Sequence, residues 1–249
     1  MTTAIIGTGG IGSAIARQLA SGGEALRLSS ADKQSAQRLA AAIGGTAVVA
    51  VDNRNVLQDA DAVILALRFS VLKDVIGEIS DELGDKSLVV PSNPVGLDAQ
   101  GKVVRLLPER QSSGETIAGW LPTGARLTIA FGTMSADLFE SSSNRSPEPA
   151  VLFYVTDDDL GGGDEVERLI RTAGFEPMKA GGIDQSNRLE VGGDLHDLIV
   201  GPAEARSLIV GPDLIATSAE PRPGSGHRPE VAHNATIAMS AGTNTGTAA

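Results

Sequence analysis

The chain has 249 residues, 41% hydrophobic and 20% charged, with a formal net charge of −11; this length fits one α/β domain or two small ones, and the acidic balance argues against a nucleic-acid partner or an anionic membrane surface. The absence of cysteine excludes disulfides, thiolate catalysis and cysteine-ligated metals, and three histidines do not favour a multi-histidine metal site. With no basic leader and no apolar run of membrane-spanning length, we expect a soluble cytoplasmic protein.

Strands and helices alternate along the chain from its first residues. Residues 4–6 form an apolar run typical of a buried strand, and residues 11–20 follow with helical apolar spacing. The same reasoning predicts strands at residues 25–28, 47–51, 62–67, 87–90, 126–131, 151–155 and 175–178, and helices at residues 33–43, 56–60, 71–83, 115–121, 165–173 and 186–200. Strands that are apolar on both faces indicate a mainly parallel sheet that helices cover on both sides.

This alternation predicts the α/β fold class, as a Rossmann-type doubly wound domain over residues 1–200. Residues 201–249 are expected to form a small C-terminal α/β extension and a tail. From about residue 216 onward the sequence is rich in proline and glycine and contains no aromatic residue. We expect disorder there, because such a stretch cannot bury enough apolar surface to offset its ordering entropy.

A glycine-rich segment lies directly between the first strand and the first helix. Gly7, Gly9 and Gly12 fit the G-x-G-x-x-G pattern, in which the glycines permit a tight turn, close approach of a pyrophosphate and close helix–strand packing. The amino end of the helix then offers free N–H groups and a partial positive charge. The alternative is a plain strand–helix turn without a ligand. The residues expected to bind the dinucleotide here are Gly7, Thr8, Gly9, Gly10, Ile11 and Gly12.

The tip of the second strand indicates NADP(H) rather than NAD(H). NAD-preferring sites usually place an acid there to accept from the ribose 2′-hydroxyl, whereas this chain has Ser29 and Ser30. Their hydroxyls can donate to a 2′-phosphate, and Lys33 can add positive charge. Asp32 would repel the phosphate, but its position favours a role as N-cap of the helix that begins near Lys33. Arg27 is expected to lie within the strand.

Loops after the later strands are expected to line the ligand crevice, because ligands of doubly wound sheets bind beyond the carboxyl ends of the strands. The residues concerned are Leu67, Arg68 and Phe69 after the fourth strand, Ser92, Asn93 and Pro94 after the fifth, and Ala130 at the end of the sixth. Phe69 can alternatively pack locally, and Phe131 suits the core as well as a ligand contact. The two prolines around Ser92 and Asn93 favour a rigid loop near the nicotinamide, with a plain turn as the alternative.

Other polar residues have simpler interpretations. Residues 157–159 are expected to cap and solvate the start of the following helix. Glu190 and His196 could form an acid–base pair, but surface positions are favoured. No Ser-His-Asp set, paired-carboxylate signature or metal cluster stands out, and hydride transfer needs none, because the cofactor supplies the chemistry. The lack of an evident general acid favours an acceptor that needs little help with protons, such as a flavin-like ring.

Several short motifs together resemble the NADP oxidoreductases that depend on the deazaflavin coenzyme F-420. They are the glycine turn with Ser29-Ser30, the strand at residues 62–67, Ser92-Asn93-Pro94, residues 124–131, residues 157–158, and Gly174-Phe175-Glu176-Pro177 followed by Ala180-Gly181. The resemblance covers residues 3–200. This chain departs from the family in lacking the Asp of Asp-x-x-Asn-Pro, in having residues 129–132 in place of Lys-Ala-Phe-Asn, and in having Ser30 where the family often has Arg.

The resemblance implies a Rossmann domain, usually dimeric, that exchanges a hydride between NADP(H) and a deazaflavin stacked in the crevice. It implies that Thr8, Ser29 and Ser30 hold the 2′-phosphate end, while residues 92–94 and Ala130 lie near the nicotinamide. We therefore expect NADP(H) as cofactor, coenzyme F-420 as co-substrate and a homodimer. Two alternatives stay open: an NADPH-dependent reductase of another small acceptor, such as a flavin, an imine or a carbonyl, and a non-catalytic NADP-binding sensor.

Overall fold

A sheet of eight strands runs through the described part of the chain, which in this computed structural model comprises residues 1–84, 86–157 and 162–210. The strands are β1 (Thr2–Ile6), β2 (Ala25–Ser29), β3 (Ala47–Val49), β4 (Ala62–Leu65), β5 (Ser87–Val90), β8 (Arg126–Ile129), β9 (Val151–Thr156) and β10 (Glu176–Gly181). Their order across the sheet is β10-β9-β8-β5-β4-β1-β2-β3. These residues belong to a compact unit that extends from Met1 to Gly211. The predicted tail lies outside the described residues.

Most neighbouring strands are parallel, as predicted. β1 pairs in parallel with β2 on one side and with β4 on the other, and β5 pairs in parallel with both β4 and β8. β9 is antiparallel to β8, with Thr128 opposite Thr156, and β10 is parallel to β9. The chain therefore builds outward from β1 to β3 and then crosses back to β4. This switch places the crevice of a doubly wound fold at the carboxyl ends of β1 and β4.

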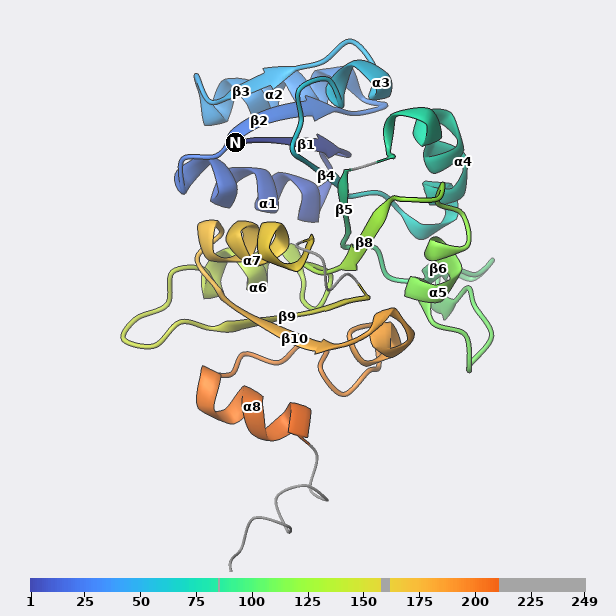
Figure 1. The fold of residues 1–249 in the computed structure, drawn as a ribbon, viewed down its shortest axis with the longest axis vertical. Helices are drawn as coiled ribbons and strands as arrows, with labels where there is room; N and C mark the ends of the chain where they lie inside the picture. Colours follow the sequence, from blue (N-terminus) through green and yellow to red (C-terminus); the bar gives the residue numbers. More distant parts are fainter. Residues whose placement is uncertain (85, 158–161, 211–249) are drawn as a thin grey trace, which may run out of the picture. The chain divides into compact units, whose positions relative to one another are not determined.

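Helices cover both faces of the sheet (Figure 1). They are α1 (Gly10–Ser21), α2 (Lys33–Ile43), α3 (Asn53–Val56), α4 (Phe69–Ile79), α5 (Ser113–Ala118), α6 (Ala136–Ser142), α7 (Gly162–Thr172) and α8 (Pro202–Val210), with 3-10 turns η1 (Ser80–Glu82) and η2 (Ile183–Arg188). Successive strand residues point to opposite faces. Ala4 and Ile6 of β1 therefore join a core beneath α3, α4 and α5, whereas Ile5 joins a second core beneath α1, α2, α6 and α7. The predicted doubly wound α/β architecture is confirmed.

The closing helix predicted at residues 186–200 is wrong. Residues 183–188 form the 3-10 turn η2, and the following stretch runs without regular structure until α8 begins at Pro202. Gly192 has a φ of +90°, and a Cβ at Gly193 would lie 2.3 Å from the carbonyl oxygen of Arg188. Two glycines held in these conformations end the helical path, because a left-handed φ does not continue a right-handed helix.

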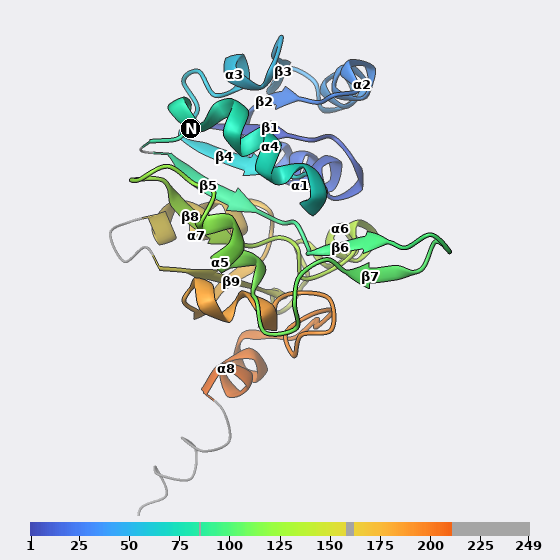
Figure 2. The ribbon, with the colours of Figure 1, turned by 90° about the vertical axis from the view of Figure 1, so that its right-hand side faces the viewer.

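Three further elements differ from the sequence-based prediction. A short antiparallel hairpin of β6 (Val95–Leu97) and β7 (Val103–Arg105) occupies a stretch expected to be a loop, and Figure 2 shows it projecting away from the main sheet. Helix α6 was not predicted. Helix α3 begins earlier than expected because Asp52 accepts the N–H of Asn55 and caps it. No helix within the described ranges is long and apolar enough to cross a bilayer.

Candidate functional site

The carboxyl edge of the parallel strands brings the predicted loops together. The turn after β1 touches the end of β4, since the N–H of Ala66 bonds the carbonyl of Ile6 at 2.9 Å. The loop after β5 reaches the same place, because the Ser92 hydroxyl donates to the carbonyl of Leu67. The N–H of Ala130 bonds the carbonyl of Val90 at 3.4 Å, which adds the end of β8. Contacts between residues 25, 40 and 60 positions apart in the sequence thus gather these segments at one edge of the sheet.

Two glycines of the turn are required by close backbone packing. Gly7 has a φ of +104°, and a Cβ there would lie 2.2 Å from the carbonyl oxygen of Ala66. A Cβ at Gly12 would lie 2.1 Å from the carbonyl oxygen of Gly7. Neither position has room for a side chain, so these residues fix the path of the chain into α1.

Gly9 differs, because the space above it is open. It is exposed, has a φ of −73°, and a Cβ built on it would meet no protein atom within 4 Å. It is also the N-cap residue of α1, and no side chain caps this helix. The first N–H groups of α1 therefore have no side-chain acceptor, and the backbone can be approached closely. A pyrophosphate fits this cradle, since it accepts from such N–H groups and matches the helix dipole.

The remaining turn residues support the cradle from behind. Thr8 is buried, and its hydroxyl donates to Ser35 at 2.9 Å. Its carbonyl accepts the hydroxyls of Ser13 and Ser35, at 2.9 and 3.2 Å. Gly10 is exposed beside Gly9, and Ile11 packs against the core beneath α1. Thr8 is thus directed toward α2, which places its hydroxyl in a structural contact.

The serines at the tip of β2 are placed differently from one another. Ser29 is buried, with 4% of its surface exposed, and its hydroxyl donates to the Asn53 side chain at 2.7 Å. Ser30 is half-buried and Lys33 is exposed. The Ser29 hydroxyl therefore already donates its hydrogen bond within the protein. Ser30 and Lys33 are more accessible to solvent. Arg27 lies within β2, as expected, and donates to the carbonyl of Asn55 at 2.7 Å.

The N-cap role predicted for Asp32 is confirmed. Its carboxylate accepts the N–H groups of Gln34 and Ser35 at 3.0 and 3.2 Å. The guanidinium of Arg38 lies 3.5 Å from the same carboxylate. The amino end of α2 thus carries one negative charge that an exposed arginine partly offsets.

The loop after β4 combines an exposed cation with a buried ring. Arg68 is exposed and precedes α4, and no ion pair joins it to the described residues. Leu67 is half-buried. Phe69 is buried, and its ring lies 5.6 Å from that of Trp120. The Phe69 side chain therefore packs locally, which was the alternative for this residue. Arg68 is the residue of this loop that a ligand can reach.

The loop after β5 is held by its own side chains. Asn93 donates to the carbonyl of Gly132 at 2.8 Å and accepts the N–H of Val191 at 2.8 Å. Pro94 is buried, and Ala130 is fully buried. Ser92, Asn93 and Ala130 line a cavity of about 10 Å³, which is room for about one water molecule.

Phe131 belongs to the core. It is fully buried, and its ring lies 5.9 Å from that of Phe139. Its φ of +65° is rare for a bulky residue. This turn leads directly into Gly132, where a Cβ would lie 2.2 Å from the carbonyl of Pro91. The end of β8 is therefore locked against the loop after β5.

Glu190 was expected at the surface, and this is wrong. Only 3% of it is exposed, and its carboxylate accepts from Arg105 at 2.5 Å and from the N–H of Ser113 at 2.7 Å. It also lines the small cavity beside Ser92 and Asn93. No local pattern could have found it, because Arg105 is 85 residues away in the sequence.

The surface position expected for His196 also needs correction. The His196 side chain is only 13% exposed; its Nδ1 lies 3.1 Å from the carbonyl of Leu189 and its Nε2 lies 3.6 Å from Asp197. For Asp157, the structure gives a contact elsewhere. Its carboxylate accepts the N–H of Ile183 at 2.8 Å, at the start of η2. Asp158 and Asp159 lie outside the described residues.

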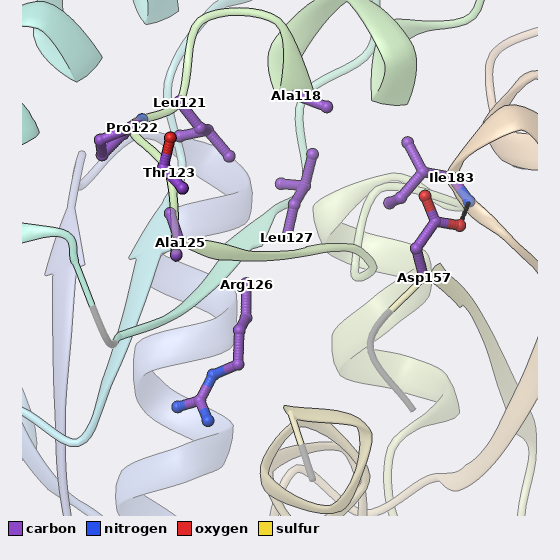
Figure 3. A pocket seen from close by; sticks show the side chains of 10 residues that line it. Ala118, Leu121, Pro122, Thr123, Ala125, Arg126, Leu127, Asp157 and Ile183 are labelled. Atoms are coloured by element: carbon purple, nitrogen blue, oxygen red, sulfur yellow. Dashed lines mark hydrogen bonds between the residues drawn. The ribbon is translucent and has the colours of Figure 1, made fainter. Parts of the chain in front are cut away.

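A wider cavity lies at the opposite edge of the sheet. It measures about 440 Å³ and is lined by residues at the start of β8, after α5 and around Ile183. Figure 3 shows Leu121, Leu127 and Ile183 around it, with Arg126 directed away from them. It does not adjoin the glycine turn, and the open surface over Gly9 is the candidate cofactor site. Among the described residues, no group of three or more potential metal ligands gathers.

Residues 2–94 match the sequence model of a family described as NADP oxidoreductase, coenzyme F420-dependent. The matched stretch includes the glycine turn, the tip of β2 and Asn93-Pro94. The resemblance noted from the motifs is confirmed over these residues. No curated protein matches the chain.

Solved structures extend the likeness beyond this stretch. A hypothetical protein from Sinorhizobium meliloti is 26% identical, with a TM-score of 0.70, and the alignment covers 81% of this chain and 95% of that one. A protein from Arthrobacter sp. FB24, provisionally described as an F420-dependent NADP reductase, is 20% identical, with a TM-score of 0.63 and coverage of 73% and 85%. A pyrroline-5-carboxylate reductase from Coxiella burnetii is 19% identical, with a TM-score of 0.55 and coverage of 75% and 61%. The last two share the fold.

Proposed function

We propose that this chain, with its NADP oxidoreductase segment, transfers a hydride between NADP(H) bound over Gly9 and an organic acceptor held at the carboxyl ends of β5 and β8. We propose the deazaflavin coenzyme F-420 as that acceptor. The cofactor half is supported by the family match and by the geometry of the glycine turn. The acceptor half is supported by the family's description and by that of the Arthrobacter protein.

The observation that carries the proposal is the open amino end of α1. Its N-cap is a glycine with free space above it, and no side chain takes up the N–H groups of its first turn. A structural turn without a ligand would gain from a capping side chain in place of Gly9, by roughly a few tenths of a kcal/mol. Leaving this position bare is favourable when a pyrophosphate supplies the acceptors instead.

The reaction needs alignment more than acid–base groups. When bound, the dihydronicotinamide supplies a hydride; the acceptor gains that hydride together with one proton from water, and NADP⁺ remains. The chain's own part is to hold the pyrophosphate at the glycine turn and to fix the acceptor against the loops after β5 and β8. It also excludes water between the two reacting carbons.

Titration calorimetry with NADPH and NADH, followed by rapid mixing of the NADPH complex with oxidised coenzyme F-420, tests the proposal. We expect NADPH to bind more tightly than NADH and the dihydronicotinamide absorbance to fall with F-420. Turnover with a flavin, an imine or a carbonyl, but not with F-420, would refute F-420 as the acceptor and leave the proposed NADP(H)-dependent hydride transfer intact. Tight NADPH binding without any turnover would favour a sensor. Absence of binding by either dinucleotide would refute the proposal.

A pair of glycine variants makes the binding test specific. Gly9→Asp places a carboxylate where the pyrophosphate is expected, yet its Cβ has free space and Asp is a favoured N-cap residue. We expect NADPH binding to be lost while the free energy of unfolding stays equal or rises. Gly77→Asp, on the exposed side of α4 with no atom within 4 Å of its Cβ, is the matched control and should bind NADPH as the wild type does.

A further inference from the structure

We infer that the buried carboxylate of Glu190 is a positioning residue for the acceptor, because it fixes residues 189–193 against the carboxyl ends of β5 and β8. This inference rests on the proposed function and concerns its acceptor half. Glu190 lies beside Ser92, Asn93 and Ala130, the residues expected at the nicotinamide end.

The first step is how Glu190 is held. Its Oε2 accepts Nη1 of Arg105 at 2.5 Å, and its Oε1 accepts the N–H of Ser113 at 2.7 Å and the hydroxyl of Ser186 at 3.4 Å. Arg105 also donates to the carbonyl of Gln111 at 2.8 Å. One carboxylate therefore gathers the end of β7, the start of α5 and the turn η2.

The second step is that these contacts close a ring. Val191, next to Glu190, donates its N–H to Asn93 at 2.8 Å. Arg105, the partner of Glu190, pairs in the β6–β7 hairpin with Val95, two residues after Asn93. Glu190 and Val191 are thus bonded to Arg105 and Asn93, which the β6–β7 hairpin itself connects. Such a ring leaves residues 189–193 little freedom to shift along the edge.

The third step is where the ring is anchored. Asn93 donates to the carbonyl of Gly132, so the ring is attached to the chain beyond β8 as well as to the loop after β5. The N–H of Asp197 bonds the carbonyl of Thr133 at 2.7 Å and fixes the far end of the segment. Residues 189–197 therefore form a wall along the part of the edge where the acceptor is proposed to lie.

The energetics favour a positional role. Burying a carboxylate costs several kcal/mol, and a well-placed arginine roughly offsets this without a large net gain in stability. An apolar residue of similar size would serve stability at least as well. What the pair provides is a directional, multiply bonded contact, which can set the geometry of a reacting complex, where a shift of about 1 Å can cost about 100-fold in rate.

The experiment compares two buried carboxylates of the same kind. Glu24 is 4% exposed and pairs with Arg168 at 2.6 Å, at the amino edge of the sheet away from the acceptor wall. We expect Glu190→Gln to raise the acceptor KM about tenfold or more, with the NADPH dissociation constant within about twofold of wild type. Glu190→Asp keeps the charge but shortens the side chain, so we again expect a raised acceptor KM with an unchanged NADPH dissociation constant. This variant tests the inference if Glu190→Gln does not fold.

Glu24→Gln should lower the free energy of unfolding and leave the acceptor KM unchanged. An unchanged acceptor KM in both Glu190 variants, or an equal rise in Glu24→Gln, would overturn the inference while wild-type turnover left the proposed function intact. A wild-type protein that binds NADPH but reduces no acceptor would instead overturn the proposed function, and this inference with it. Hydrogen exchange of residues 186–197 gives an independent readout, with faster exchange expected in Glu190→Gln than in Glu24→Gln.

Discussion

At Asp32, one carboxylate has two opposing effects on the proposed cofactor. It caps α2 through the N–H groups of Gln34 and Ser35, which stabilises the helix. It also places negative charge at the tip of β2, where a 2′-phosphate is expected, and Arg38 at 3.5 Å offsets that charge only in part. If NADP(H) binds as proposed, its preference over NAD(H) depends on this group as well as on the serines before it.

Asp32→Asn separates the two effects. The amide oxygen can still accept the N–H groups, while the charge is removed. We expect NADPH to bind about fivefold more tightly, which corresponds to about 1 kcal/mol for one exposed charge pair at close range, with NADH little changed and the gain smaller at high salt. Titration calorimetry at two salt concentrations measures this. Asp98→Asn is the control, because Asp98 also accepts two backbone N–H groups, from Gln100 and Lys102, in the β6–β7 turn.

Gly7 and Gly12 lead to a prediction of a different kind. A Cβ at either position would lie within 2.2 Å of a carbonyl oxygen, so we expect Gly7→Ala and Gly12→Ala to lower the free energy of unfolding by about 3 kcal/mol or more. Chemical denaturation measures the loss. Gly9→Ala has open space around its Cβ and should lower the free energy of unfolding by no more than about 1 kcal/mol, the cost of a poorer N-cap residue. Equal losses at all three positions would contradict the assignment of packing to two and ligand approach to the third.

At the scale of single elements, the sequence predicts the parallel strands and the helices between them well. β5 and α2 have the predicted bounds, because an apolar strand between turn residues and a helix with Asp32 before it are recognised locally. The hairpin β6–β7 escapes such reasoning, since three-residue strands give too short an alternation. α6 escapes it because its cap, Ser135, precedes only seven helical residues.

In the candidate site too, features formed by neighbouring residues could be predicted from the sequence, and features formed by distant residues could not. The glycine turn is recognisable because its chemistry depends on consecutive residues. The opposite role of the two adjacent serines is not, since the burial of Ser29 depends on Asn53, which lies 24 residues further along the chain. The position of Glu190 depends on Arg105 and Ser113, from two other elements. A pairing of this kind follows from the tertiary fold, which single-sequence patterns do not contain.

The segment between η2 and α8 carries a pH-dependent contact. The hydrogen bond from Arg188, together with its charge, holds the pKa of Asp194 below its ordinary value of 3.8, against a smaller desolvation effect. Because the folded-state pKa is lowered, the pair stabilises the fold fully above the unfolded-state value. This stabilisation is lost as the pH falls through the folded-state pKa.

Asp194→Asn should therefore unfold more easily than the wild type at neutral pH, by well under about 1 kcal/mol because the carboxylate is 60% exposed. The difference should vanish as the pH falls below 3.8, the ordinary value. Urea denaturation at several pH values measures it. Asp74→Asn, at an exposed position on α4, is the control and should follow the wild-type profile. A difference that persists in acid would contradict an ionic origin.

At the scale of the whole described unit, a second buried ion pair joins the start of β2 to helix α7. Glu24, just before β2, accepts both Thr3 of β1 and Arg168 of α7, and Arg168 also donates to Glu165. The amino edge is therefore tied across strands β1 and β2 and helix α7. This network lies at the edge opposite the glycine turn.

Arg168→Met should lower the free energy of unfolding by about 3 kcal/mol or more, because it leaves the Glu24 charge buried and unpaired. NADPH affinity should stay within about twofold of wild type, since the cradle over Gly9 is untouched. The double variant Glu24→Gln with Arg168→Met should recover part of the stability, as no buried charge remains. Denaturation and calorimetry on the same samples measure both quantities. A loss of NADPH affinity in proportion to stability would show that the two edges are coupled.

The reversal of the last two strands has a consequence for how this fold can diversify. Because β9 and β10 run against β8, the chain after β10 returns over the carboxyl edge as residues 189–197. The glycine turn, the β2 tip and Arg68 all precede residue 95, whereas Arg105, Ser113, Glu190 and Val191 follow it. In the proposed function, the nucleotide contacts thus precede most of the residues around the acceptor, although Ser92 and Asn93 of the earlier block also lie there. Exchanging the later block between relatives would recombine one nucleotide preference with a new reaction partner, and the junction would fall at Pro94.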